Sequence, residues 1–299
     1  MLYDLGVLRE IYEKNENLME YMKKYNQLGN NTVEEIMISY DFQAGSYAKR
    51  FYEKPETRQE YLQRLIRIIV EKDITGTLLE AGVGEATSLV TILNNTGKDR
   101  FTDVYGFDVS WSRIKMAKEV GRNYGYDNVN FFTGDMMNMP LADNSFDLVY
   151  TVHAVEPNGG KEKEVLQELY RVCKKHLILL EPCYEYACQE AKDRMLRHGY
   201  VTNLYDTAKQ LGYDIELYEI YGEMRNELNP TGIMIINKQS TEEYYNNQPC
   251  PFVCPISKRN MIRNDDSFYC ADSMLAYPII QSIPCLLPGN AVVATKYNS

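Results

Sequence analysis

A glycine-rich turn follows the first buried, strand-like run of the sequence. The run ends at Glu80 and Ala81, and Gly82 and Gly84 follow where a helical pattern opens. Glycine lets the backbone take positive φ values and come close to a ligand. In an open parallel sheet a ligand binds outside the carboxyl end of such a strand. The spacing therefore favours a cofactor site over a purely structural strand–turn–helix connection.

Two classes of cofactor use a turn of this kind. A nicotinamide dinucleotide needs a third glycine, because its pyrophosphate rests on the helix N-terminus. Thr87 stands at that position, and Glu80 would lie unfavourably beside a pyrophosphate. S-adenosylmethionine (SAM) has no phosphate and carries an ammonium group, which an acidic side chain attracts. The two substitutions therefore favour SAM over a nicotinamide.

Two more carboxylates follow later strand-like runs. Asp108, with Val109 after it, ends a run where a carboxylate can accept hydrogen bonds from both ribose hydroxyls. Either Asp108 or Ser110 could instead cap the next helix. Asp135 and Met136 follow a third run, where a carboxylate can accept from the adenine amino group and a backbone N–H can reach the ring. An ordinary turn is the alternative for this pair.

These motifs, followed by Phe-Asp-Leu-Val at 146–149, occur in a characteristic order. Over roughly residues 75–238 the sequence resembles the class I SAM-dependent methyltransferase superfamily. The resemblance implies an α/β fold with a seven-stranded, doubly wound Rossmann-like sheet. It also implies SAM as the cofactor and methyl transfer as the reaction.

The resemblance assigns a role to each matching position. The residues expected around the cofactor are Glu80, Ala81, Gly82 and Gly84 at the methionine part, Asp108 and Val109 at the ribose, Asp135 and Met136 at the adenine, and Thr151 and His153 beneath the sulfonium. Upstream, residues 39–47 resemble the segment that such enzymes fold over the cofactor. Tyr40 and Tyr47 are therefore candidates to close the methionine end, and packing on a helix is an equally good interpretation of both.

Candidate acceptor-side residues follow the fourth and fifth strand-like runs. Methyl transfer is an in-line displacement that depends on positioning, and a general base helps when the acceptor is a hydroxyl. His153 and Glu156 follow one run, and Glu181 and Tyr184 follow the next. A histidine suits a base because it titrates near neutrality. Anchoring of a loop by His153, and termination of a strand at Glu181 before Pro182, are the alternatives.

The elements that must position these residues alternate along the chain. Short apolar runs alternate with helical stretches from residue 75 onwards, which predicts parallel strands joined by crossover helices. The last two runs lack a clear helix between them, so we expect an antiparallel final strand. Residues 1–73 are expected to form a helical lid, with Thr32 and Glu35 as a capping box. Residues 74–239 are the expected SAM-binding domain.

A cysteine-bearing tail at 248–299 is expected to be a small β-rich module. It resembles the zinc-ribbon-like activator domain that accompanies tRNA, ribosomal RNA and translation-factor methyltransferases. A structural zinc site needs four ligands, and only Cys254 and Cys270 match, since Ser257 and Ser273 stand at the partner positions. Cys250 and Cys285 are irregular substitutes, so a metal-free module is predicted. The odd total of seven cysteines argues against a disulfide framework.

Charge and composition limit the partners. The net charge of −10 disfavours broad nucleic-acid binding. Neither a membrane-spanning run nor a secretory signal is visible, so a cytoplasmic location is expected. The acidic charge and the 25 tyrosines weakly favour a sugar or nucleotide-sugar acceptor, although tyrosines at half-buried positions explain the count as well.

Three functions remain open from the sequence. The leading hypothesis is methyl transfer to an oxygen or nitrogen atom of a small molecule. The second is an RNA or protein methyltransferase with its activator domain fused in cis, which would need a basic groove. The third is a non-catalytic, SAM-binding adaptor. The oligomeric state is open, with a homodimer as one option.

Overall fold

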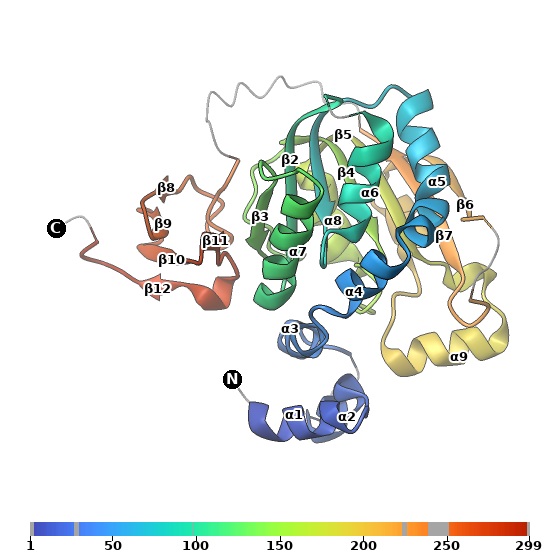
Figure 1. Cartoon of the computed structure of the whole chain (residues 1–299), viewed down its shortest axis with the longest axis horizontal. Helices are drawn as coiled ribbons and strands as arrows, with labels where there is room; N and C mark the ends of the chain where they lie inside the picture. The colour runs from blue at the N-terminus through green and yellow to red at the C-terminus, as the bar shows by residue number, and fades with distance from the viewer. Residues whose placement is uncertain (1–2, 27–29, 98, 223–225, 239–250, 298–299) are drawn as a thin grey trace.

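The centre of the molecule is a seven-stranded sheet, seen in a computed structural model that describes residues 3–26, 30–97, 99–222, 226–238 and 251–297 (Figure 1). The strands are β1 (Gly76–Ala81), β2 (Phe101–Asp108), β3 (Asn130–Thr133), β4 (Phe146–Val152), β5 (Cys173–Pro182), β6 (Asp214–Ile220) and β7 (Thr231–Asn237). Their order is β3-β2-β1-β4-β5-β7-β6. The first five strands are parallel, and β7 is antiparallel to both β5 and β6. The predicted seven-stranded, doubly wound sheet is confirmed, together with its antiparallel final strand.

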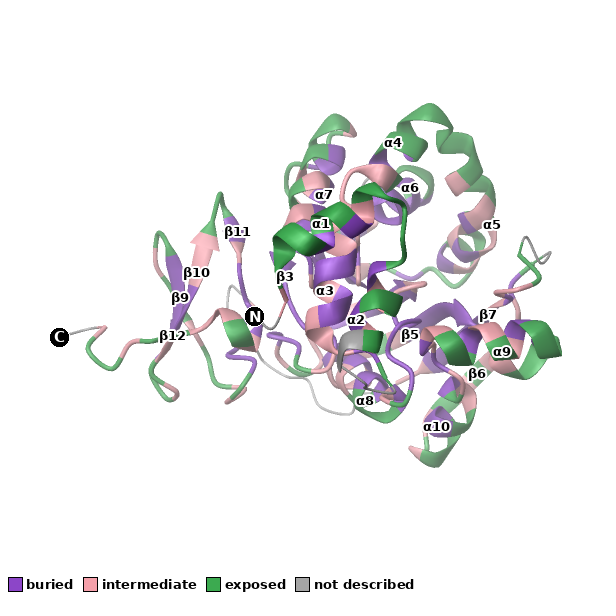
Figure 2. Ribbon diagram, turned by 90° about the horizontal axis from the view of Figure 1, so that it is seen from below, coloured by how far each residue is buried: buried purple, intermediate pink, exposed green. Residues whose placement is uncertain are grey.

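Both faces of this sheet are buried, which explains the continuous apolar runs of its strands. Neighbouring residues in a strand point to opposite faces, so Leu78 and Leu79 join two different hydrophobic clusters. The first face is covered by α5 (Pro55–Glu71), α6 (Thr87–Thr96) and α7 (Trp111–Asn123). The second face is covered by α8 (Glu162–Val172), α10 (Leu204–Gln210) and part of the tail. Figure 2 shows the buried strands between more exposed helices.

Four shorter helices precede α5 and lie at one end of the sheet (Figure 1). They are α1 (Leu5–Glu13), α2 (Leu18–Asn26), α3 (Val33–Phe42) and α4 (Ser46–Glu53). The amphipathic pattern of residues 1–29 predicts one helix there, but the structure has two, because α1 ends before Asn15, which has a φ of 59°. Thr32 and Glu35 form the predicted capping box of α3. Pro55 occupies the first turn of α5, where its missing N–H costs nothing.

Two further elements lie between β5 and β6. A short 3-10 turn, η1 (Tyr184–Tyr186), is followed by α9 (Gln189–His198), and α10 then leads into β6. Within the part of the chain that the structure describes, no helix is both long and apolar enough to cross a bilayer.

The tail is a small antiparallel module packed against β3, the edge strand of the main sheet. Its strands are β8 (Ile262–Arg263), β9 (Ser267–Cys270), β10 (Leu275–Ile280), β11 (Ile283–Pro284) and β12 (Val292–Val293), with a 3-10 turn at η2 (Pro288–Asn290). Thr133 of β3 pairs with Cys285, and its carbonyl accepts from the N–H of Leu286 at 3.0 Å. The exposed edge of the large sheet is thereby covered.

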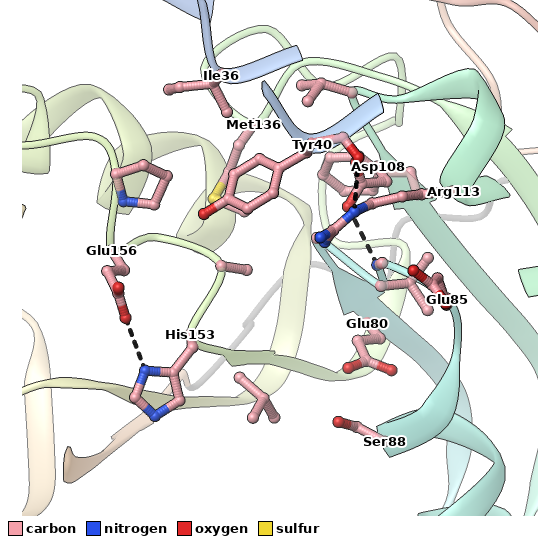
Figure 3. A pocket seen from close by; sticks show the side chains of 18 of the residues that line it. Ile36, Tyr40, Glu80, Glu85, Ser88, Asp108, Arg113, Met136, His153 and Glu156 are labelled. Atoms are coloured by element: carbon pink, nitrogen blue, oxygen red, sulfur yellow. Dashed lines mark hydrogen bonds and ion pairs between the residues drawn. The ribbon is translucent and has the colours of Figure 1, made fainter. Parts of the chain in front are cut away.

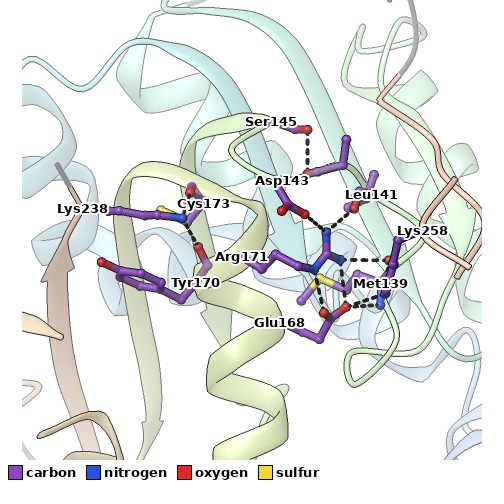
Figure 4. Close-up of polar contacts among 11 residues, drawn as sticks. Met139, Leu141, Asp143, Ser145, Glu168, Tyr170, Arg171, Cys173, Lys238 and Lys258 are labelled. Carbon is purple, nitrogen blue, oxygen red and sulfur yellow. Dashed lines mark hydrogen bonds and ion pairs between the residues drawn. The ribbon is translucent and has the colours of Figure 1, made fainter. Parts of the chain in front are cut away.

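Aromatic packing and one polar network join the tail to the main sheet. The ring of Phe252 meets Phe132 edge-on at a centroid distance of 4.9 Å and Tyr105 at 6.0 Å. In Figure 4, Lys258 of the tail reaches Glu168 of α8, whose carboxylate also accepts from Arg171 and from the N–H of Met139. The nitrogen of Lys258 lies 2.9 Å from the Glu168 carboxylate. The module thus shares its core with the main sheet.

We expect Phe252→Ala to lower the free energy of unfolding by about 3 kcal/mol, because the cavity left among three aromatic rings cannot collapse fully. Urea unfolding followed by circular dichroism measures this change. Ile256→Ala, on a tail side chain that is 58% exposed, is the matched control and should cost less than about 0.5 kcal/mol. Equal effects of the two substitutions would contradict a shared core.

Candidate functional site

A cavity of about 340 Å³ lies at the carboxyl ends of β1, β2 and β4, beneath α3 (Figure 3). Its volume falls in the range of roughly 300–1,000 Å³ that is usual for small-molecule sites. The chain order of the strands reverses between β1 and β4, so this is the switch point of the sheet. We call it the first cavity. Of the sequence-predicted residues, those that line it are Tyr40, Tyr47, Glu80, Gly82, Gly84, Asp108, Val109, Asp135, Met136, His153 and Glu156.

The glycine turn lies against the loop that follows β4. Gly82 has a φ of 74°, and a Cβ added to it would stand only 2.3 Å from the Cβ of Ala154. Gly84 has a φ of 53°. The close approach to Ala154 therefore requires glycine at 82, and the left-handed backbone favours glycine at 84.

Glu80 is almost fully buried at the end of β1. One of its carboxylate oxygens accepts a hydrogen bond from the Tyr150 hydroxyl at 2.8 Å. Burial raises the pKa of Glu80 to about 8, and the Tyr150 hydrogen bond opposes that rise only in part. A cation in the cavity would favour the charged form of Glu80.

Asp108 faces the cavity and also fixes the backbone around it. Its two oxygens accept from the N–H of Gly84 at 3.1 Å and from the N–H of Ser110 at 2.9 Å. The capping of α7 is done by Ser110, whose hydroxyl accepts from the N–H of Arg113. Burial raises the pKa of Asp108, with Arg113 opposing the rise. The helix is therefore capped by Ser110 and not by Asp108, and the Asp108 carboxylate lies on the wall of the cavity.

Asp135 occupies a similar position beyond β3. One oxygen accepts from the N–H of Met137 at 2.9 Å, and the other accepts from the amide of Asn138 at 3.2 Å. The side chain is buried and still lines the cavity beside Met136. It therefore acts as a turn residue in addition to being a candidate ligand of adenine.

Helices α3 and α4 close the cavity through Arg113. The Arg113 guanidinium stacks over the rings of Tyr40 at 4.4 Å and Tyr47 at 4.8 Å. Two carboxylates hold the same segment: Glu85 accepts from the N–H groups of Gly45 and Ala48, and Asp41 accepts from Ser110 and Ser112. Arg113 and Glu85 were not among the residues predicted from the sequence, although each lies close in the chain to a predicted cofactor residue.

His153 and Glu156 form a close pair on the loop after β4. The Nδ1 atom of His153 lies 2.8 Å from a Glu156 oxygen, and its Nε2 atom lies 2.9 Å from both the Tyr61 hydroxyl and the Thr231 hydroxyl. His153 has a φ of 52°, an unusual conformation for a residue with a side chain. The carboxylate of Glu181 stabilises this loop by accepting from the N–H groups of Ala154 and Glu156.

The two members of this pair shift each other's pKa values. Burial alone would lower the pKa of His153, but the hydrogen bond and charge of Glu156 outweigh it, so the pKa is raised. Burial alone would raise the pKa of Glu156, but His153 outweighs it, so the pKa is lowered. The histidine's contribution to stability is lost as pH rises through its folded pKa, and the glutamate's is lost as pH falls through its folded pKa. The pair therefore stabilises the fold most between the reference values of 4.5 and 6.5.

Four predicted site residues do not line this cavity. Ala81 and Thr151 are fully buried in β1 and β4. Glu181 is 3% exposed, and both of its oxygens accept from backbone N–H groups, so it holds the loop rather than facing a ligand. Tyr184 lies on η1, and the centre of its ring is 5.3 Å from the Nζ atom of Lys192 on α9. In a buried strand, residues at the carboxyl end can point inward as readily as toward a ligand.

A second cavity of about 610 Å³ adjoins the first between α4, α5 and the start of β7. His153 and Arg58 line both cavities. Tyr61 and Thr231 line the second and bring their hydroxyls to His153. Tyr61, Thr231 and Arg58 were not among the residues predicted from the sequence, because they come from elements that are distant in the chain from the motif after β4.

The tail brings together the four positions at which the resemblance placed zinc ligands. The Cys254 sulfur lies 3.5 Å from the Ser273 hydroxyl, and the Cys270 sulfur lies 3.5 Å from the Ser257 hydroxyl. Burial would raise the pKa of Cys254, but hydrogen bonds, the first of them from Ser257, lower it to about 7. Among the described residues, no group of three or more histidine, cysteine or acidic side chains converges to hold a metal ion. Cys250 lies outside the described residues.

Comparison with known proteins identifies the central part of the chain. Residues 78–176 match the family model of the methyltransferase domain. A stretch of 72 residues is 36% identical to demethylmenaquinone methyltransferase of Anoxybacillus flavithermus and covers 24% of this chain and 30% of that protein. A stretch of 103 residues is 33% identical to sterol 24-C-methyltransferase of Pneumocystis carinii and covers 33% of this chain and 25% of that protein. The chain thus spans less than a third of the length of these curated relatives.

Solved structures of similar shape were also found. Magnesium protoporphyrin IX methyltransferase from Synechocystis, with bound S-adenosylhomocysteine (SAH), matches at 13% identity and a TM-score of 0.49, covering 79% of this chain and 100% of that one. A SAM-dependent methyltransferase from Aquifex aeolicus matches at 18% identity and a TM-score of 0.44, covering 57% of this chain and 88% of that one.

We expect Glu156→Gln to lower the pKa of His153, because the neutral amide removes the charge that outweighs burial and leaves only Glu181 to oppose it. The chain has three histidines, so NMR of the imidazole groups can follow His153 directly. The signals of His176 and His198 serve as internal controls. An unchanged titration of His153 would show that Glu156 does not set its charge.

Proposed function

We propose that this protein is a SAM-dependent methyltransferase that acts on an oxygen or nitrogen atom of a small molecule. The observation that carries the proposal is the acidic first cavity at the switch point of a methyltransferase-type sheet. The bare backbone of Gly82 and the free cavity face of Asp108 fit a nucleoside cofactor that lies across the carboxyl ends of β1 and β2.

The charges in the first cavity fit a cationic cofactor. SAM, when bound, supplies an electrophilic methyl group on a positively charged sulfur. Glu80 and Glu156 would face the positive groups, and Asp108 would accept hydrogen bonds from the ribose hydroxyls. A buried carboxylate such as Glu80, with its pKa raised to about 8, becomes ionised more readily when a cation binds beside it. Tyr40 and Tyr47 would close the methionine end.

The loop after β4 supports a hydroxyl acceptor. Glu156 binds the Nδ1 side of His153 and leaves Nε2 directed toward the second cavity. Nε2 could then take the proton from an acceptor hydroxyl as its oxygen bonds to the methyl carbon and the bond from that carbon to the sulfur breaks, which would leave SAH. Glu156 would stabilise the imidazolium that forms, and Glu181 holds the loop in place through its hydrogen bonds to the backbone. Tyr61 and Thr231 mark where the acceptor hydroxyl would bind, because both already hydrogen-bond to this nitrogen.

The acceptor class that we place first is a sugar or nucleotide-sugar. Such molecules carry several hydroxyls, and the second cavity offers the rings of Tyr61 and Tyr221 together with polar groups, as ligand pockets commonly do. A non-catalytic adaptor is less consistent with an oriented histidine and glutamate facing two connected cavities.

We propose further that the tail is a zinc-ribbon-like activator module that has lost its metal. The meeting of Cys254 with Ser273 and of Cys270 with Ser257 supports this origin, because a hydroxyl is a much poorer zinc ligand than a thiolate. The same module supports the second candidate function, an RNA or protein methyltransferase with its activator in cis. Binding of a tRNA or of a translation-factor substrate, set against sugar acceptors, distinguishes the two.

We expect Asp108→Ala to weaken binding of SAH by roughly 10- to 100-fold, the loss that one or two hydrogen bonds to a carboxylate would give. Isothermal titration calorimetry measures the change. Asp103→Ala removes an exposed carboxylate from the same strand and should leave the affinity unaltered. If both variants bind SAH as the parent does, the proposed cofactor site is wrong.

We expect His153→Asn to lower kcat for a hydroxyl acceptor by roughly 100-fold or more, because the base is lost. Asparagine tolerates the left-handed backbone at this position, so the loop is kept. The rate of SAH release, with acceptors drawn from sugars and nucleotide-sugars, is the measurement. His176→Asn, on β5, is the control. Full activity of His153→Asn would exclude the histidine as the base.

A further inference from the structure

Charged side chains divide unequally between the two cavities. The first cavity is lined by five acidic and two basic residues, which are Glu80, Glu85, Asp108, Asp135, Glu156, Arg58 and Arg113. Among the described residues, the second is lined by three basic residues and one acidic residue, which are Arg50, Lys54, Arg58 and Glu53. The chain as a whole has a net charge of −10, so the basic lining of the second cavity runs against the overall composition.

The three basic residues follow one another at intervals of four. Arg50 lies on α4, Lys54 joins α4 to α5, and Arg58 lies in the first turns of α5. Lys54 has a non-helical backbone, with a φ of −147°, so the chain turns between the two helices, and all three side chains line the second cavity. The N-terminal end of α5 adds a positive dipole at the same place. The positive potential is therefore concentrated at the mouth of the second cavity.

Arg58 connects this region to the reacting centre. It lines both cavities, as His153 does. Its charge lowers the pKa of both Tyr61 and Glu80, although burial raises each of them more. Arg50 and Lys54 line the second cavity and not the first. An anion held by Arg50 and Lys54 would thus lie on the far side of His153 from the glycine turn.

We propose that the second cavity binds the acceptor through a negatively charged oxyanion group, a phosphate or a carboxylate, held by Arg50, Lys54 and Arg58. This inference rests on the proposed function, because it assumes that the first cavity holds the cofactor. It narrows the acceptor to a hydroxyl compound with an acid group beyond the hydroxyl that is methylated. The opposite charges of the two cavities direct the cationic cofactor and the anionic acceptor to separate ends of one chamber.

The experiment is a calorimetric titration of the full chain saturated with SAH. Inorganic pyrophosphate is the probe for a phosphate group, and citrate is the probe for a carboxylate group. The parent protein should bind at least one of them, and the tighter probe identifies the class of acid. The double variant Arg50→Gln/Lys54→Gln should bind that probe at least about tenfold more weakly, while its affinity for SAH stays unchanged. Arg67→Gln, on the exposed side of α5, is the charge-matched control and should bind as the parent does.

A second variant is expected to tighten binding of the probe, which damage to the fold would not do. Glu53→Gln removes an acidic side chain that lines the second cavity and should tighten binding of the same probe by about two- to threefold. The inference is overturned if neither anion binds the parent protein, or if both the double variant and Glu53→Gln bind as the parent does. Absence of SAH binding would count against the proposed cofactor site alone, and the anion titrations on the ligand-free chain would still test the second cavity.

Discussion

The arrangement of the site depends on buried carboxylates that accept hydrogen bonds from backbone N–H groups. Loops beyond parallel strands have N–H groups that no sheet partner satisfies, and leaving them bare inside the protein is costly. Asp108 accepts from the N–H groups of Gly84 and Ser110, and Glu181 accepts from those of Ala154 and Glu156. Glu85 accepts in the same way from two N–H groups at the start of α4. These bonds set the shapes of the loops that carry the candidate ligand-binding side chains.

This way of building a site also creates its electrostatics. Carboxylates gathered at one edge of the sheet give the first cavity an excess of negative charge, and burial keeps their mutual repulsion strong. Burial raises the pKa values of Glu80 and Asp108, and the charge of Asp108 adds a smaller rise at Glu80, so each would bind a proton more readily than a free carboxyl group does. A cationic ligand relieves this repulsion, so the same residues that order the loops favour a positively charged cofactor.

The sequence motifs predicted the sheet, its strand ends and the wall of the first cavity, because each motif joins a buried strand to a turn of restricted geometry. They did not separate residues that face the cavity from residues that brace it. Glu181 and Thr151 stand at strand ends as Asp108 does, but they point into the protein. No sequence motif marks Tyr61, Thr231 or Arg58 as site residues. They reach the neighbourhood of His153 only because α5 and β7 pack there.

The position of the tail has a consequence for how the chain is made. The main sheet has β3 as an edge strand, and this edge is covered by Cys285 and Leu286, which are synthesised about 150 residues after Thr133 at ribosomal rates of roughly 5–20 residues per second. For that interval a nascent sheet presents an unpaired edge and the bare ring of Phe132, both of which invite association with neighbouring chains. Translation speed and chaperone supply are therefore expected to limit the yield of folded protein more than the stability of the finished fold does.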